Sequence, residues 1–583
     1  MIHKKNDILF TLFMLAIILT TGMFLGSRVL LEVNDPPELI DGSYDAVVLS
    51  NDTLKDTRDG GLAPGDVDVS EPILLEAARL REDGYLDASL SMVERVYRKN
   101  PTDQKALDEL VSVYIAMEQF EKAEQMLLHL LELAPEKARF YYNMGVVKSM
   151  QGESAEAVAA YRKAVELNPI YTRAHYNLGV IHLKMDSLEE AEGHFRAIIQ
   201  NDQSADSAKA YFQLGYILSR QKGRTAGAIE FYTKAITLKP DYYQARNNLA
   251  LQLEKIDEKE KAIVELKKAI ALNPSLVSAL LNLGRLYSES GQLEESADSY
   301  RLATQAKPSL AKAFFSLGAV EEERSRFEEA IEAYESVLAL EPDHLSAIMR
   351  LGVLYGQANE SEKTETYLKR ALSIDPKYAS AWDGLGTLYA GQNRNELALE
   401  HFNKAIELDP ENLSAQFSKA VVLESLKRDK AAIKAYLGII KQDTSHLQSR
   451  YRLVDLYVQA GDFKKAAAQA RRIEKMAPED PQALAAVSSA YLSMELPDKA
   501  LVRQEKIVEL APDDISARVT LGDIYSRLGR YPDAIRVYHS AYEENPTDIT
   551  LLNALGEAYQ SNADPNQALL YFKRAAEQEA TGP

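Results

Sequence analysis

The alternation of apolar and polar positions divides the chain into three parts. Residues 8–27 form an uninterrupted apolar run without a charged side chain, and residues 32–69 are polar and acidic. From residue 70 onward, small, aliphatic and aromatic residues recur at a fixed interval, a pattern that predicts pairs of amphipathic helices. We therefore expect an all-α protein with a short tail at 1–7, an apolar segment at 8–31, a spacer at 32–69 and a helical body at 70–583.

Prolines show the interval most clearly, because proline cannot continue a helix and so fixes a boundary. They recur with one regular period at 101, 135, 169, 240, 274, 308, 342, 376, 410, 478, 512 and 546, with Thr444 in the slot between Pro410 and Pro478. The interval from Pro169 to Pro240 departs from this period, and we expect its three extra residues to be divided between 202–207 and 221–224. The sequence predicts fifteen repeats, numbered here 1 to 15, starting near 70, 104, 138, 172, 208, 243, 277, 311, 345, 379, 413, 447, 481, 515 and 549.

The period, about 34 residues, resembles that of the tetratricopeptide repeat (TPR) family of helix-turn-helix arrays. The residues that carry the resemblance in repeat 10 are Trp382, Leu385, Gly386, Tyr389, Ala398, Phe402, Ala405 and Pro410. The resemblance implies a superhelical solenoid in which each helix pair covers apolar surface of the next. It also implies a concave face that binds partner proteins.

The apolar run at 8–27 predicts a single transmembrane helix, since twenty helical residues span about 30 Å, the thickness of a bilayer core. Lys4 and Lys5 precede it, whereas acidic residues follow Arg28. By the positive-inside tendency we expect a cytoplasmic N-terminus and an extracytoplasmic body, periplasmic in a Gram-negative cell. The alternative is a cleaved signal peptide and an exported soluble protein. The apolar run continues through residues 23–25 without an A-x-A pattern, which favours a retained anchor.

The amino-acid composition argues against several classes of function. The net charge is −20, from 87 acidic and 67 basic residues, which argues against nucleic-acid partners. Residues 32–69 hold ten acids and two bases, so we expect a flexible, self-repelling spacer. Cysteine is absent and no catalytic motif was found, so we expect neither an enzyme nor a cofactor. The histidines His175, His182 and His194 could suggest a metal site, but interior packing is the favoured interpretation.

The TPR resemblance implies that positions 2, 5, 9, 12 and 13 of each first helix line the concave face. In repeats 3, 4 and 5 these positions hold five bases, four aromatic residues and no acid, whereas acids dominate the later repeats. Position 6 carries amides that resemble the asparagine ladder of O-linked N-acetylglucosamine transferases, although asparagine there is also a common packing residue of the family. The hypothesised peptide-binding residues are Arg139, Tyr142, Asn143, Arg173, Tyr176, Asn177, Lys184, Lys209, Phe212, Gln213, Tyr216, Arg220, Asn247, Asn248 and Asn282.

These features predict a membrane-anchored scaffold that holds extended, acidic or carboxylate-ended segments of partner proteins. Such a scaffold would help to assemble a cell-envelope complex for secretion, pilus formation or polysaccharide export. The alternative is a non-catalytic accessory subunit of a membrane enzyme, such as a glycosyltransferase or a cytochrome-maturation system. Because little sequence after repeat 15 could cap the stack, self-association is also an expectation.

Overall fold

The computed structural model describes residues 70–201 and 207–581, which form thirty helices and no strand. The predicted tail, anchor and spacer lie outside the described residues. Within the described ranges, every helix is too short or too polar to cross a membrane.

The two helices of a repeat are nearly equal in length. The bounds of all helices are α2 Ser70–Glu82, α3 Leu86–Lys99, α4 Gln104–Ala116, α5 Phe120–Leu133, α6 Ala138–Met150, α7 Ser154–Leu167, α8 Thr172–Lys184, α9 Leu188–Asn201, α10 Ala208–Arg220, α11 Thr225–Leu238, α12 Tyr243–Glu254, α13 Lys259–Leu272, α14 Val277–Glu289, α15 Leu293–Ala306, α16 Ala311–Glu323, α17 Phe327–Leu340, α18 Leu345–Gln357, α19 Ser361–Ile374, α20 Ala379–Gly391, α21 Asn395–Leu408, α22 Leu413–Ser425, α23 Asp429–Gln442, α24 Leu447–Gln459, α25 Phe463–Met476, α26 Pro481–Ser493, α27 Pro497–Leu510, α28 Ile515–Arg527, α29 Tyr531–Glu544, α30 Ile549–Ser561 and α31 Pro565–Thr581.

The predicted repeats are confirmed, because all fifteen even-numbered helices begin at the expected positions. In each repeat, a turn with one left-handed residue joins the even-numbered first helix to the odd-numbered second helix. In repeat 3 this residue is Gly152, with φ of 82°, and the next amide, of Glu153, donates to the Lys148 carbonyl at 2.9 Å. This bond closes the first helix in the manner of a Schellman motif.

The three extra residues of the long interval lie where the sequence predicted. The link between α9 and α10 comprises 202–207, whereas the corresponding link between α7 and α8 comprises only 168–171. The link between α10 and α11 comprises 221–224, against 151–153 between α6 and α7. Two residues are therefore added before α10 and one in the turn that follows it.

Glycine in the first helix lets the two helices of a pair approach closely. A Cβ atom on Gly145 would lie 2.6 Å from the Tyr161 ring, well inside van der Waals contact. Tyr161, Ala157 and Ala164 of the second helix are fully buried. The aromatic ring thus occupies the volume that a side chain at Gly145 would need.

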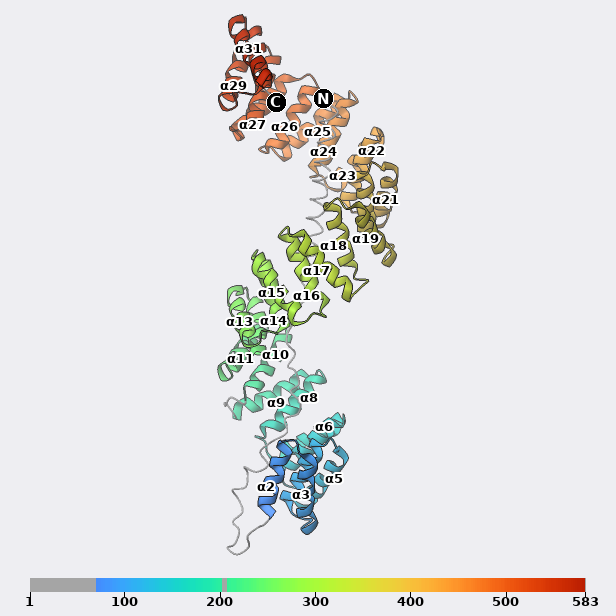
Figure 1. The fold of residues 1–583 in the computed structure, drawn as a ribbon, viewed down its shortest axis with the longest axis vertical. Helices are drawn as coiled ribbons and strands as arrows, with labels where there is room; N and C mark the ends of the chain where they lie inside the picture. Colours follow the sequence, from blue (N-terminus) through green and yellow to red (C-terminus); the bar gives the residue numbers. More distant parts are fainter. Residues whose placement is uncertain (1–69, 202–206, 582–583) are drawn as a thin grey trace. The chain divides into compact units, whose positions relative to one another are not determined.

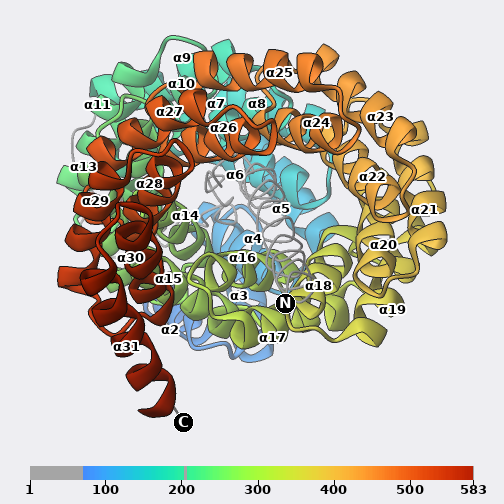
Figure 2. The ribbon, with the colours of Figure 1, turned by 90° about the horizontal axis from the view of Figure 1, so that it is seen from above.

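The described residues form two compact units, 70–341 with α2–α17 and 342–581 with α18–α31. In each unit, helices pack mainly against their neighbours in sequence, as Figure 1 shows. In the second unit, Figure 2 shows the first helices, such as α20 and α22, on the inner side of a curve and the second helices, such as α21 and α23, on the outer side. The even-numbered helices therefore supply the concave face of that unit.

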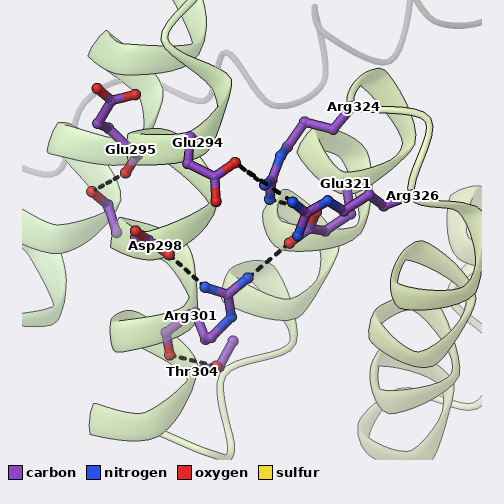
Figure 3. A network of polar contacts seen from close by, with 9 residues as sticks. Glu294, Glu295, Asp298, Arg301, Thr304, Glu321, Arg324 and Arg326 are labelled. Carbon is purple, nitrogen blue, oxygen red and sulfur yellow. Dashed lines mark hydrogen bonds and ion pairs between the residues drawn. The ribbon is translucent and has the colours of Figure 1, made fainter.

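The residue at position 11 of the first helix contacts a lysine or arginine side chain in many repeats. It is often tyrosine, and the guanidinium of Arg394 lies 4.5 Å from the centroid of the Tyr389 ring in repeat 10. In repeat 8 this position holds the buried Glu321, which accepts from Arg301 at 2.9 Å and from Arg324 at 2.7 Å (Figure 3). The carboxylate replaces a cation–π contact with ion pairs that join two repeats.

Candidate functional site

The predicted binding residues lie on α6, α8, α10, α12 and α14, all first helices of the unit 70–341. Seven of them are buried and so present little surface to a ligand: Tyr142, Asn143, Phe212, Gln213, Asn247, Asn248 and Asn282. Tyr142 and Phe212 are each 1% exposed. The Tyr142 ring packs against Tyr161 of α7 and Tyr171 just before α8. The Phe212 ring packs in the same way against Tyr232 of α11 and Tyr242 just before α12. Tyr142 and Phe212 act as core residues between repeats.

The position-6 amides mostly hydrogen bond within the protein. Asn177 donates to the Tyr161 hydroxyl at 3.1 Å, and Asn248 donates to the Tyr232 hydroxyl at 3.4 Å. Each of these bonds joins the first helix of one repeat to the second helix of the preceding one. They support the packing interpretation of these asparagines over that of a ligand ladder.

A second set of amide bonds continues between α12 and α14. Asn282 donates to the side-chain oxygen of Asn247 at 3.1 Å, and Asn247 donates to that of Asn248 at the same distance. Asn143 and Gln213 form no comparable bond with the residues that the structure describes. The side chains of Asn177, Asn248 and Asn282 therefore make hydrogen bonds between repeats, whereas those of Asn143 and Gln213 make none in the described part of the chain.

Arg139 pairs with an acid that the sequence interpretation omitted. Its Nη2 atom lies 2.8 Å from Oδ2 of Asp108, which is at position 5 of the preceding repeat and only 3% exposed. Burial raises the pKa of Asp108, and the nearby Arg139 and Arg81 guanidinium groups oppose that rise. Arg139 is therefore held in an ion pair with a buried acid. Without Arg139, the predicted run of bases begins in repeat 4, with Arg173.

The accessible part of the candidate site lies on repeats 4 and 5. We call it the basic face and define it as Arg173, Tyr176 and Lys184 of α8 with Lys209, Tyr216 and Arg220 of α10. All six side chains are partly or fully exposed. Arg220 lies 5.9 Å from the Tyr216 ring centroid and pairs with Asp186 of the preceding repeat at 3.0 Å.

The basic face is chemically suited to anionic segments. Its two guanidinium and two ammonium groups can donate to carboxylates, and arginine can do so in a bidentate manner. Tyr176 packs edge-on against Phe195 of α9, with ring centroids 5.7 Å apart, so the core fixes its ring orientation. The face thus combines cations with an aromatic ring held in place.

The histidine cluster, His175, His182 and His194, lies between α8 and α9. Nδ1 of His175 and Nδ1 of His194 are 3.1 Å apart, and Nε2 of His175 lies 2.9 Å from the Pro169 carbonyl oxygen. Since a carbonyl oxygen only accepts, Nε2 of His175 donates to it, and in the tautomer with its single ring proton on Nε2 the Nδ1 atom accepts from Nδ1–H of His194. Burial and the two neighbouring histidines lower the pKa of His194 to about 4.

His182 completes the cluster with its ring stacked on His194 at 5.5 Å between centroids. Both of its ring nitrogens are buried and have no hydrogen-bond partner among the described residues. Burial lowers its pKa as well. Across residues 70–201 and 207–581, no group of three or more histidine or acidic side chains has an arrangement that could hold a metal ion.

Sequence reasoning also missed the buried charges of repeats 1 and 2. Glu109 accepts from Nε of Arg81 at 2.8 Å, and this pair adjoins the Asp108–Arg139 pair. The signal was present in the sequence, since Asp108 and Glu109 occupy positions 5 and 6 of α4. The pairing of these two acids with Arg81 and Arg139 across the repeat boundaries follows only from the folded structure.

Family models agree with this architecture. Models described as TPR or tetratricopeptide repeats match residues 105–137, 150–186, 208–242, 265–297, 323–388, 384–446, 451–515 and 515–558. The chain is a tetratricopeptide repeat protein. Every matching model belongs to the TPR family, whose folds are typically non-catalytic scaffolds for protein–protein interaction. Among curated proteins, no sequence match is found.

Several solved structures resemble parts of this TPR protein. YrrB, described as a TPR protein with an unusual peptide-binding site, is 25% identical over 33% of this chain and 98% of its own, with a TM-score of 0.31. MamA is 24% identical over 28% of this chain and 95% of its own, with a TM-score of 0.27. Yeast Tom70 is 16% identical over 76% of this chain and 98% of its own, with a TM-score of 0.33.

Proposed function

We propose that this TPR protein is an adaptor whose basic face holds extended, acidic or carboxylate-ended segments of partner proteins. The observation that carries the proposal is the concentration of four cations and two tyrosines on the first helices of two successive repeats, in a chain of net charge −20. Opposite charge speeds encounter and selects partners, while aromatic rings add contact area. An extended anionic segment fits both features.

We further propose that residues 8–31 anchor the TPR body to a membrane and that the body faces away from the cytoplasm. The support is the uncharged run at 8–27 and the lysines that precede it. In this position the protein would assemble a cell-envelope complex. The same topology would serve an accessory subunit of a membrane enzyme.

Two experiments test these proposals. A reporter enzyme that is active only outside the cytoplasm, fused at residue 60, should be active, and an inactive reporter would reverse the assigned side. Mild crosslinking and pull-down should recover envelope proteins from wild-type cells. Charge reversal of Arg173, Lys184 and Lys209 together should abolish that capture.

A matched variant reverses three bases outside the first helices: Lys163 on α7, Lys222 in the turn after α10 and Lys234 on α11. It changes the net charge by the same amount and should leave capture intact. Equal capture by both triple variants would contradict the basic face as the binding surface. Recovery of one membrane enzyme, with altered turnover when this protein is deleted, would favour the accessory-subunit function instead.

A further inference from the structure

Residues 32–69 and the basic face have opposite charge within one chain. The segment holds ten acids against Lys55 and Arg58, and the basic face holds four cations. Opposite charges attract more strongly near a protein surface than in bulk water, because the effective dielectric constant is lower there. Several such contacts formed together would give measurable affinity even without a defined sequence motif.

The connection between the two is short. Residue 69 directly precedes Ser70, where α2 and repeat 1 begin. Successive helices in contact lie about 10 Å apart, so α8 and α10 lie within roughly 80 Å of α2. The length of 32–69 allows a span of at most about 130 Å. The acidic segment can therefore reach α8 and α10 from its attachment point.

We propose that residues 32–69 are themselves a ligand of the basic face and compete there with the acidic segment of a partner. This inference rests on the proposed function, because both use the same cations. A tether of this length gives an effective concentration of about 1 mM at the face. A contact with an intrinsic dissociation constant of about 100 μM would then weaken the binding of an outside ligand about tenfold.

The acidic segment would set a minimum affinity that a partner needs in order to occupy the basic face. Partners must bind the basic face more tightly than the chain's own acids do. Weakly acidic proteins are excluded, and a partner with a longer or denser run of carboxylates displaces the segment. Since the contact is electrostatic, high salt should release the segment and the outside ligand alike.

The first test maps the contact in the full-length protein. A photo-crosslinking amino acid replaces Tyr44, which lies within the acidic segment, and crosslinked peptides are identified by mass spectrometry. We expect crosslinks to α8 and α10 that disappear when Arg173, Lys184 and Lys209 are reversed in charge. They should persist in the control with Lys163, Lys222 and Lys234 reversed. Crosslinks to α8 and α10 that persist after the charge reversal of Arg173, Lys184 and Lys209 would overturn the proposal.

The same experiment with mixed isotope-labelled and unlabelled chains identifies the source of the segment. Crosslinks within one chain support the proposal. Crosslinks mainly between labelled and unlabelled chains would overturn it in favour of contact with a second copy.

The second test measures competition, using a fluorescein-labelled decapeptide of alternating glutamate and glycine with a free carboxyl end as the probe. In one full-length variant all ten acids of 32–69 become the corresponding amides, and in its matched control the segment is scrambled with its composition kept. We expect the amide variant to bind the probe about tenfold more tightly than wild type, and the scrambled variant to bind like wild type.

The outcomes separate the two proposals. Equal, salt-sensitive binding by wild type and the amide variant would overturn the self-ligand and leave the basic face standing. A scrambled segment that fails to compete would overturn recognition by charge. Binding by neither protein would overturn the proposed function itself.

Discussion

Arg139 in α6 and Asp108 in α4 form an ion pair across a repeat boundary, with Nη2 and Oδ2 2.8 Å apart. Arg139 and Arg81 are the two described cations that lower the pKa of Asp108. Removal of the Arg139 guanidinium would leave this nearly buried carboxylate with Arg81 alone. We expect Arg139→Gln to destabilise the unit 70–341 by about 1–3 kcal/mol, because a nearly buried acceptor loses its donor. Urea unfolding followed by circular dichroism measures this. Adding Asp108→Asn should restore part of the loss, and an additive effect of the two substitutions would contradict the pair.

Substitution of glycine by alanine should have opposite effects at two helical positions. A Cβ on Gly145 would meet the Tyr161 ring at 2.6 Å, so Gly145→Ala should destabilise the protein by about 1–3 kcal/mol through overpacking. An added Cβ on Gly193 in α9 meets no atom of the described chain, so Gly193→Ala should stabilise the helix by about 0.5–1 kcal/mol. Thermal unfolding of the two variants checks both signs, and a stabilising Gly145→Ala would contradict the close approach of α6 and α7.

The sequence was sufficient for the repeats because each boundary has local physical causes. A proline or a polar turn ends the second helix, and small residues such as Gly145 and Ala157 permit the pairing of helices. This is why all fifteen starts and the insertion near 202–207 were predicted correctly. The division into units 70–341 and 342–581 was not predicted, because it depends on packing between repeats and not on the period.

The candidate site was less predictable for a related reason. Position numbers within one repeat do not show which side chain lies across the boundary with the next. The Asp108–Arg139 and Asn282–Asn247 contacts both cross such boundaries. Burial of Tyr142 and Phe212 likewise depends on the tyrosines that precede the following repeat.

The histidine cluster predicts loss of stability in acid. The pKa of His194 is about 4 in the folded protein, below the ordinary value of 6.5, because of burial, the neighbouring His175 and His182, and Arg162, with Glu190 opposing. A lowered histidine pKa means that the unfolded chain takes up the proton first, so stability falls as the pH drops from about 6.5 to 4. Because solvent screens this half-buried ring, His194→Phe should reduce the stability difference between pH 7.5 and pH 5 by about 1 kcal/mol. An unchanged difference would contradict a neutral, buried His194.

Asp383 in α20 predicts the opposite dependence on pH. Burial raises its pKa to about 7, a hydrogen bond with Asn412 opposes the rise, and its Oδ1 atom has no partner among the described residues. A raised carboxyl pKa favours folding while the group is protonated, so this stability is lost as the pH rises towards 7. Asp383→Asn should therefore stabilise the unit 342–581 by about 1–3 kcal/mol at pH 8 and have little effect at pH 4. Destabilisation at pH 8 would show that the carboxylate is stably paired there.

The salt dependence of probe binding reports how many cations take part. Four cations that each contact the glutamate–glycine probe should make its affinity fall steeply between 50 and 500 mM salt, because screening shortens the reach of exposed charges. Single charge-removing variants, such as Lys184→Gln or Lys209→Gln, should each weaken binding about three- to tenfold at low salt. Affinity that is indifferent to salt would point to aromatic contacts instead.

The most direct measurement is the anisotropy titration of the glutamate–glycine probe with three full-length proteins. These are the wild type, the variant with Arg173, Lys184 and Lys209 changed to glutamate, and the control with Lys163, Lys222 and Lys234 changed to glutamate. Circular dichroism first establishes that all three proteins are equally helical. The predicted result is saturable binding by the wild type and the control and a loss of at least about 100-fold in the first variant. Equal affinities for all three proteins would contradict the basic face as the binding surface.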